Sequence, residues 1–303
     1  MEKHSENDKI REATVAGIFY PEDPAELKAE IERLISLHSS RASDISPAPD
    51  ENSKDRQPRA IFSPHAGFTY SGDLSALAWS SARKRKISRV VVLSPIHRPE
   101  EALVFLPESD CFATPFGFID VDRASVEEML DCGTVFSMND IPHFEEHGVE
   151  VQLPFMHYFF PDASLVPILV GSDPNPKEDG DPLQQAEKLI APLSKALNLV
   201  FSDKLESTLF VLSSDLSSGP EAAEVKIMAD ETLDCIEKEN PEALLKVTRP
   251  GVSGACGATA IAACLESGLL GSGGVELLGR HDSASKRESA RENFVEYAAL
   301  AFF

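Results

Sequence analysis

Three short apolar segments of the chain stop abruptly at polar turns. They end at Phe62, Leu93 and Leu212. The turns that follow are Ser63-Pro64-His65, Ser94-Pro95-Ile96-His97 and Ser213-Ser214-Asp215. Short continuous apolar runs are typical of strands that are buried on both faces of a parallel sheet. Because the carboxyl ends of parallel strands meet at the same edge, we expect the three turns to form one site.

Segments with helical features alternate with these strands. Asp23-Pro24-Ala25-Glu26 combines an N-cap, a proline in the first turn and a glutamate at the third helical position. Further helices are expected at about 73–85, 182–197, 221–239, 241–247 and 251–268, and further strands at about 102–106, 112–121, 165–170, 275–278 and 295–301. This alternation predicts an α/β fold, in which helices flank a central sheet that is mostly parallel or mixed.

The same pattern predicts one domain at residues 13–303. Residues 1–12 are charged, and we expect them to form a disordered N-terminus. Residues 15–21 resemble a short edge strand. From about 38 to 58 the chain is rich in Ser, Asp, Pro and Asn and has almost nothing to bury, which predicts a mobile surface excursion.

Composition narrows the choice of partners. The 303 residues are 42% hydrophobic, and their net charge of −22 repels nucleic-acid phosphate and anionic membranes. An acidic surface can equally serve solubility alone. No segment approaches the roughly 20 apolar residues of a membrane span, and the first residues lack the apolar core of a secretion signal. The five cysteines have no regular spacing. We expect a cytoplasmic protein without disulfides that binds neither nucleic acid nor membranes.

His65 and His97 are candidate metal ligands or proton carriers, because each follows a buried strand in a Ser-Pro turn. Either could instead simply complete its turn. Cys256 lies among small residues at the start of a predicted helix, where a thiolate is favoured. It is a candidate soft metal ligand or nucleophile, and the alternative is a small core residue.

Three other side chains are candidates for proton transfer. Asp215 could orient a histidine or a metal-bound water, or act only as a helix cap. His147 and Glu150, three residues apart at the start of a helix, could face the same cavity. We expect Glu145 and Glu146 to be solvated. The chain has no phosphate-binding glycine motif, so nucleotides are disfavoured.

Two longer motifs carry a resemblance to a known family. They are Ser63-Pro64-His65-Ala66-Gly67-Phe68-Thr69-Tyr70-Ser71-Gly72 and Glu146-His147-Gly148-Val149-Glu150-Val151-Gln152-Leu153-Pro154. With Leu93-Ser94-Pro95-Ile96-His97, Ser213-Ser214-Asp215 and Cys256-Gly257, they make the chain resemble the Memo family. Proteins of that family have a fold similar to class III non-haem iron extradiol dioxygenases.

The resemblance implies a metal site. Its ligands would be His65, His97 and Cys256, with the cysteine in the place of a dioxygenase carboxylate, and the metal would be iron or copper. His147, Glu150 and Asp215 would orient the ligands or transfer protons. The family usually has Ser-Asp-x-x-His where this chain has Ser218 in place of the histidine, so a general acid or base is lost unless His147 supplies it.

Three hypotheses follow. The first is a metal-dependent oxidoreductase, similar to a dioxygenase, that acts on a small molecule in the crevice at the strand ends. The second, implied by the resemblance of some Memo proteins to signalling adaptors, is a module without enzymatic activity that binds peptides or phosphopeptides in the same crevice. The third is metal-free hydrolysis with Cys256 as nucleophile and a histidine as base.

Overall fold

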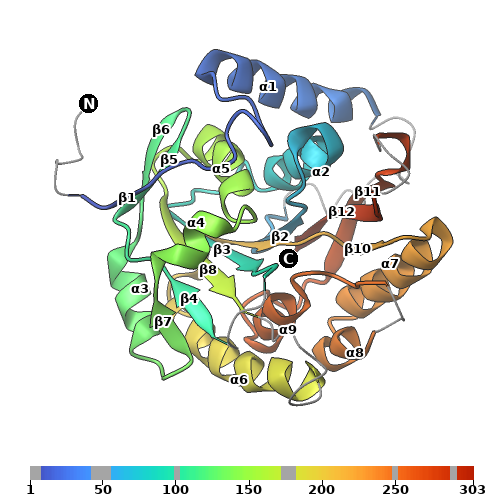
Figure 1. The fold of residues 1–303 in the computed structure, drawn as a ribbon. Helices are drawn as coiled ribbons and strands as arrows, with labels where there is room; N and C mark the ends of the chain where they lie inside the picture. The colour runs from blue at the N-terminus through green and yellow to red at the C-terminus, as the bar shows by residue number, and fades with distance from the viewer. Residues whose placement is uncertain (1–7, 42–55, 99–102, 172–181, 248–251, 287–291) are drawn as a thin grey trace.

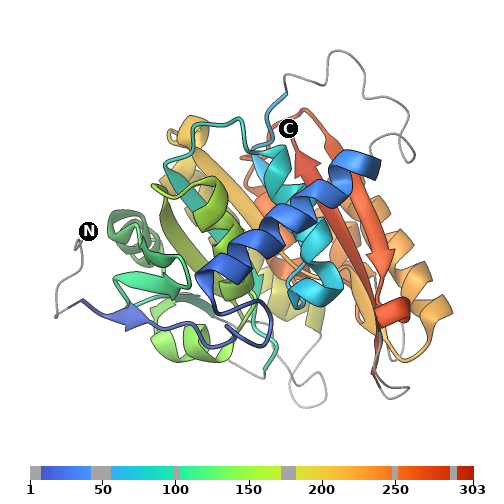
Figure 2. The same cartoon turned by 90° about the horizontal axis from the view of Figure 1, so that it is seen from above.

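The computed structural model describes residues 8–41, 56–98, 103–171, 182–247, 252–286 and 292–303. A sheet runs through the middle of the molecule, and helices lie on both sides of it (Figure 1). The view from above shows α1 (Pro24–Arg41) crossing the molecule in front of α2 (Phe68–Ser81) (Figure 2). The α/β architecture that the sequence predicts is therefore confirmed.

Nine strands of the described residues form the main sheet, in the order β10-β12-β2-β9-β3-β8-β4-β7 with β11 also paired to β12. Their bounds are β2 (Ala60–Ser63), β3 (Arg89–Pro95), β4 (Val104–Leu106), β7 (Phe136–Met138), β8 (Ser164–Val170), β9 (Thr208–Ser213), β10 (Ser217–Gly219), β11 (Val275–Asp282) and β12 (Phe294–Phe302). The central strands β2, β9, β3 and β8 run parallel and are almost entirely buried. Burial on both faces explains their continuous apolar runs. Antiparallel β12 and β4 make the sheet mixed.

A smaller sheet holds the start of the described chain in place. β1 (Ile10–Arg11) pairs in parallel with β5 (Cys111–Thr114), which forms the expected hairpin with β6 (Gly117–Asp120). Arg11 is only 1% exposed. The prediction of disorder over 1–12 is therefore wrong at its end, because the Arg11 guanidinium finds buried hydrogen-bond acceptors. Residues 1–7 lie outside the described ranges.

Helices cover both faces of the main sheet. α1, α2 and α5 pack together on one side, and α6, α8 and α9 pack together on the other (Figure 1). The bounds not yet given are α3 (Arg123–Leu130), α4 (Asp140–Glu145), α5 (Leu153–Phe159), α6 (Pro182–Phe201), α7 (Ala222–Glu237), α8 (Pro241–Lys246) and α9 (Ala258–Glu266). α1 begins where its sequence predicts, because Oδ1 of Asp23 accepts the N–H groups of Ala25 and Glu26 at 2.8 and 2.9 Å. No helix in the described ranges has both the length and the apolar composition to cross a bilayer.

Three element predictions need correction. α2 begins at Phe68, earlier than the expected start near 73, because the chain turns directly into the helix from Gly67. The segment 15–21 is a tight turn rather than an edge strand, with a single bridge between Ala16 and Tyr20. In the segment predicted to be a mobile excursion, residues up to Arg41 continue α1, and residues 42–55 lie outside the described ranges.

The order of the central strands brings the three polar turns together. β9 lies between β2 and β3. Ser63 pairs with Ser213, and Leu93 pairs with Leu212, so the three strands end at nearly the same level. The expectation that their turns meet at one edge is confirmed, and this edge holds the candidate site.

Candidate metal centre

His65, His97 and Cys256 meet at the carboxyl edge of the central strands. His65 follows β2, His97 follows β3, and Cys256 immediately precedes Gly257, the N-cap of α9. One nitrogen of each imidazole and the Cys256 Sγ all lie within 4.8 Å of one another. The sulfur is 3.4 Å from Nε2 of His65, and the two imidazole centres are 5.0 Å apart. The three ligands expected from the sequence are thus close enough to share one ion.

Glu146 orients His97. Its Oε2 lies 2.7 Å from His97 Nδ1, and its Oε1 accepts the His97 backbone N–H at 2.7 Å. Because Nδ1 donates to a carboxylate, Nε2 is the nitrogen left to bind a metal ion. Glu146 is 4% exposed, so the expectation that it is solvated is wrong. The neighbouring Glu145 does lie nearer the surface, where it pairs with Arg98.

Glu146 and His97 each stabilise the charged form of the other. Burial acts to lower the pKa of His97, but hydrogen bonds with Cys256 and Glu146 raise that pKa to about 9. Burial likewise acts to raise the pKa of Glu146, whereas the hydrogen bonds and charge of His97 lower it. The geometry therefore favours an imidazolium–carboxylate pair at neutral pH when no ion is bound.

A buried chain of donors orients His65. The Trp79 Nε1–H, which can only donate, points to Oε1 of Gln152 at 3.0 Å. The Gln152 amide nitrogen must then donate, and it reaches the Pro64 carbonyl at 2.9 Å and Ser213 Oγ at 3.1 Å. The Ser213 hydroxyl in turn donates to the Gly148 carbonyl at 2.7 Å. Ser213 Oγ is left to accept from His65 Nδ1, 3.1 Å away, so Nε2 of His65 faces Cys256 with its lone pair.

Cys256 is held by the turn that follows β9. The backbone N–H of Asp215 points to its sulfur at 3.2 Å, and Ser214 Oγ lies 3.4 Å from it. Ser214 Oγ also accepts the N–H of Gly257 at 2.9 Å. The carboxylate of Asp215 accepts the backbone N–H of His65 at 3.2 Å. Asp215 thus links the cysteine to the histidine turn.

His147 joins the cluster from the loop after α4. Its ring stacks on His97 with a centroid distance of 5.1 Å and an interplanar angle of 15°, and it meets His65 edge to face at 5.3 Å. Burial, together with the charges of His65 and His97, lowers the pKa of His147 to about 3. His147 also forms a second group of possible ligands with His97 and Glu146. It is therefore a neutral imidazole at the edge of the site.

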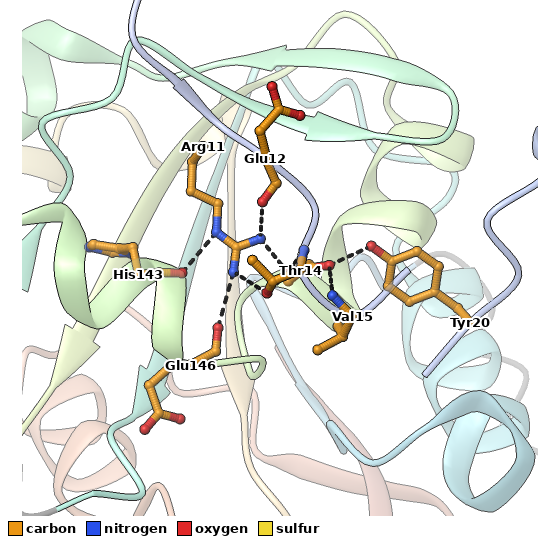
Figure 3. A network of polar contacts seen from close by, with 8 residues as sticks. Arg11, Glu12, Thr14, Val15, Tyr20, His143 and Glu146 are labelled. Carbon is orange, nitrogen blue, oxygen red and sulfur yellow. Dashed lines mark hydrogen bonds and ion pairs between the residues drawn. The ribbon is translucent and has the colours of Figure 1, made fainter. Parts of the chain in front are cut away.

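Glu150 does not face this cluster, which corrects the expectation that it shares a cavity with His147. Its buried carboxylate forms an ion pair with Arg11 and accepts the backbone N–H groups of Thr14 and Val15 at 3.0 and 2.9 Å. The Tyr20 hydroxyl donates to it at 2.8 Å. Figure 3 shows Arg11, Thr14, Val15 and Tyr20 pointing toward one another in this network. Burial acts to raise the pKa of Glu150, but Arg11 and the backbone donors lower it. Glu150 anchors the N-terminal segment and has no free oxygen for catalysis.

Arg11 connects this anchor to the site loop. Its Nε donates to the carbonyl of His143 at 2.8 Å, and its Nη2 donates to the carbonyl of Glu146 at 3.2 Å (Figure 3). The sequence gives no signal for Arg11, which lies in a charged segment. Glu146 and Gln152 could have been suspected, because both belong to the motif that contains His147. Ser213 follows a predicted strand, but its role depends on side-chain direction.

A cavity of about 520 Å³ opens beside the cluster. His147 and Asp215 lie in its wall, together with aromatic side chains of Phe19, Tyr70 and Tyr297. Ser218, which stands where the family histidine is expected, lies in β10. Its backbone exchanges hydrogen bonds with Ser253 at 2.9 and 2.8 Å, and it is not among the residues of the cavity wall or the metal cluster.

Comparison with known proteins agrees with the motifs. The profile of the Memo-like protein family matches residues 11–301. A MEMO1 family protein of Aeropyrum pernix is 30% identical over 267 residues, which cover 86% of this chain and 89% of the relative. A MEMO1 family protein of Methanobrevibacter smithii is 33% identical over 212 residues, covering 69% of each chain. The match spans both sheets and every residue of the cluster, and this chain belongs to the Memo family.

Proposed function

We propose that this protein binds a transition-metal ion through His65, His97 and Cys256 and uses it as an oxidoreductase. The observation that carries the proposal is the orientation of the ligands. Each imidazole has its Nδ1 engaged by an outer partner, Ser213 or Glu146, which leaves both Nε2 atoms available as ligands, and the Nε2 of His65 lies 3.4 Å from the Cys256 sulfur. Outer partners of this kind are typical of histidine ligands.

The donor set favours iron or copper. Two imidazoles and one thiolate suit both metals, and a thiolate tunes the potential of either ion. A bound ion would supply dioxygen chemistry in the case of iron, or one-electron transfer in the case of copper. The remaining groups are protein-based. His147 is neutral near pH 7 but only a weak base, because burial and the neighbouring histidines lower its pKa to about 3, while Asp215 and Glu146 keep the two histidine ligands in place.

Metal content is the direct test. We expect near-stoichiometric iron or copper in protein that is purified anaerobically without chelators, and loss of that metal in His65→Ala and Cys256→Ala. His157→Ala and Cys132→Ala are matched controls, because neither residue belongs to the clusters of possible ligands. Both controls should keep the metal. Protein that lacks metal and takes up none on reconstitution would contradict the proposal.

Activity is a separate question from binding. Oxygen uptake by the metal-loaded protein, measured against a panel of small apolar substrates, tests the oxidoreductase part. Uptake should depend on His65 and Cys256 and should persist in the two control variants. A loaded protein that consumes no oxygen and transfers no electrons with any substrate would leave a metal-binding protein without this activity.

A second candidate rests on the 3.4 Å contact between Cys256 Sγ and His65 Nε2. A thiol beside an oriented imidazole resembles the pair of a cysteine hydrolase. Iodoacetamide distinguishes the two functions. Rapid alkylation of Cys256 in the metal-free protein, together with hydrolysis of activated esters that disappears in His65→Ala, would support the hydrolase. Protection of Cys256 by added iron or copper supports the metal centre.

The adaptor hypothesis has less support. Phosphopeptide recognition generally relies on clustered arginines. Among the described residues, the cavity wall contains the carboxylates of Asp215 and Glu292 and no arginine or lysine. A phosphopeptide that bound with unchanged affinity to His65→Ala and Cys256→Ala would revive this hypothesis.

A further inference from the structure

The cavity beside the metal cluster is lined by both apolar and polar side chains. Phe19, Tyr70, Tyr297 and Val295 contribute its aromatic and aliphatic surface. His147 and Asp215 lie at the end that faces the cluster, since His147 stacks on His97 and the Asp215 N–H points to Cys256. A volume of about 520 Å³ suits a small molecule. A ligand with an apolar body and one polar end would match this shape.

The aromatic wall is fixed in position before any ligand arrives. The edge of the Phe19 ring meets His147 at a centroid distance of 4.8 Å, and the Phe19 carbonyl accepts the Phe68 N–H at 2.7 Å. The turn that carries Phe19 is anchored at both ends, because Val15 and Tyr20 donate to Glu150 (Figure 3). A wall held in this way loses little entropy on binding.

Among the described residues of the cavity wall, the charged side chains are of one sign. Asp215 and Glu292 supply carboxylates to its wall, and no lysine or arginine of the described residues lines it. The nearby Lys286 donates to the Tyr70 carbonyl at 2.9 Å and lines a neighbouring pocket with Asp73 and Asp282. An anionic ligand would therefore meet repulsion, and a cation would meet attraction.

We propose that the cavity binds small molecules with an aromatic or apolar body and a cationic or neutral end, and that it disfavours carboxylates. This names the substrate class for the proposed metal-dependent reaction, and it rests on the proposed function only for the identity of the reacting end. Aromatic walls and carboxylates together are the groups that recognise organic cations.

Three matched probes test the charge preference. Phenethylamine, 2-phenylethanol and 3-phenylpropanoate share a phenyl ring and two methylenes and differ only in an ammonium, a hydroxyl or a carboxylate. Calorimetry or ligand-observed NMR on the full chain, both as purified and after chelation of metals, gives their affinities. We expect the amine to bind the chelated protein about tenfold more tightly than the acid, with the alcohol between them.

Variants of the cavity residues test whether the charge preference among the three probes arises in the cavity. Phe19→Ala should weaken all three probes severalfold, because it removes a shared apolar contact. Glu292→Gln should leave the alcohol unchanged and reduce the ratio of amine to acid binding, and Asp215→Asn should do the same. Asp282→Asn, in the neighbouring pocket, is the matched control and should preserve that ratio.

The outcomes separate the ligand class from the metal centre. Equal or tighter binding of 3-phenylpropanoate by the chelated protein, absence of binding by all three probes, or unchanged affinities in Phe19→Ala would overturn the ligand class. If metal analysis finds no metal but the charge order holds, the proposed function fails and the ligand class stands. If metal is bound but the probes show no charge order, the ligand class fails and the proposed function stands.

Discussion

The carboxylate of Glu146 accepts hydrogen bonds from both the backbone N–H and the ring Nδ1 of His97, each at 2.7 Å. One side chain thus fixes where His97 lies and which nitrogen it offers to the site. Glu146→Gln keeps the size of the side chain but removes the charge. We expect the affinity for iron or copper to fall about 10- to 100-fold, as for other outer partners of histidine ligands. Competition with a chelator of known affinity measures the change.

Glu145→Gln is the control for that experiment, because it removes the same charge from the adjacent residue, which pairs with Arg98 near the surface. Its metal affinity should match the unmodified protein. Equal losses in the two variants would mean that only the overall charge matters, and would count against an orienting role for Glu146.

Ser213 should determine the tautomer of His65. In the metal-free protein we expect ¹⁵N NMR to show His65 protonated at Nδ1, since Ser213 Oγ is 3.1 Å from that nitrogen and its own proton goes to Gly148. Ser213→Ala should relax this preference and weaken metal binding. Ser81→Ala, whose hydroxyl bonds only within its own helix, should change neither signal. An Nε2-protonated His65 in the unmodified protein would contradict the donor chain.

Gly148 leaves space that the site needs. A Cβ at this position would overlap Ser94 Oγ and lie 3.0 Å from His65 Nδ1. Gly148→Ala should therefore displace His65 and lower metal affinity even in folded protein. Gly254→Ala is a fair comparison, because its added methyl would meet neighbours at ordinary distances of 3.6 Å or more. Circular dichroism and thermal melts separate loss of metal from loss of fold.

The pair of Arg11 and Glu150 should behave as one unit in stability measurements. Each partner is almost fully buried, so removing one leaves an uncompensated charge. We expect Arg11→Met or Glu150→Gln alone to lower the free energy of unfolding by about 3–5 kcal/mol. The double variant should lose clearly less than the sum of the two. Urea denaturation at pH 7 provides these values, and strict additivity would argue against direct coupling.

Acid should destabilise the fold in two stages. Burial and the charge of Arg11 lower the pKa of His143 to about 3, below its usual value of about 6.5. Below pH 6.5 the unfolded chain takes up a proton that the folded chain refuses, so stability falls by up to about 1.4 kcal/mol per pH unit for this group. The pKa of Glu150 is also lowered. Its contribution is present above about pH 4.3 and is lost as the pH falls through its folded pKa.

His143→Leu isolates the first stage. The free energy of unfolding of this variant should decline less steeply between pH 6.5 and about 5.5, where Glu150 is almost fully charged in both states. Part of the decline in the free energy of unfolding remains in this variant, because the pKa of His147 is also lowered to about 3. Curves that run parallel for the variant and the unmodified protein would show that His143 does not contribute.

Much of the candidate site could be predicted because it depends on strand ends. His65, His97 and Asp215 follow apolar runs, and parallel strands bring such ends together regardless of side-chain detail. For Glu146 and Glu150, the spacing of residues in the sequence predicted the wrong surroundings. A helical pattern places Glu150 beside His147, but the chain is extended at Glu146 and only then enters a short 3₁₀ turn. This bend turns Glu146 toward His97 and Glu150 toward Arg11. Arg11 and Trp79 contribute through contacts with residues distant in sequence, which local patterns do not reveal.

His65 and Cys256 are 191 residues apart in the sequence, so they are synthesised at very different times during translation. β2 finds its neighbours only after β9 and β12 have been synthesised, because it lies between them. Contacts this distant in sequence slow the folding of a chain. During translation the two histidines therefore emerge long before the thiol that completes the proposed set of three ligands, so the proposed site can be assembled only after Cys256 has been synthesised.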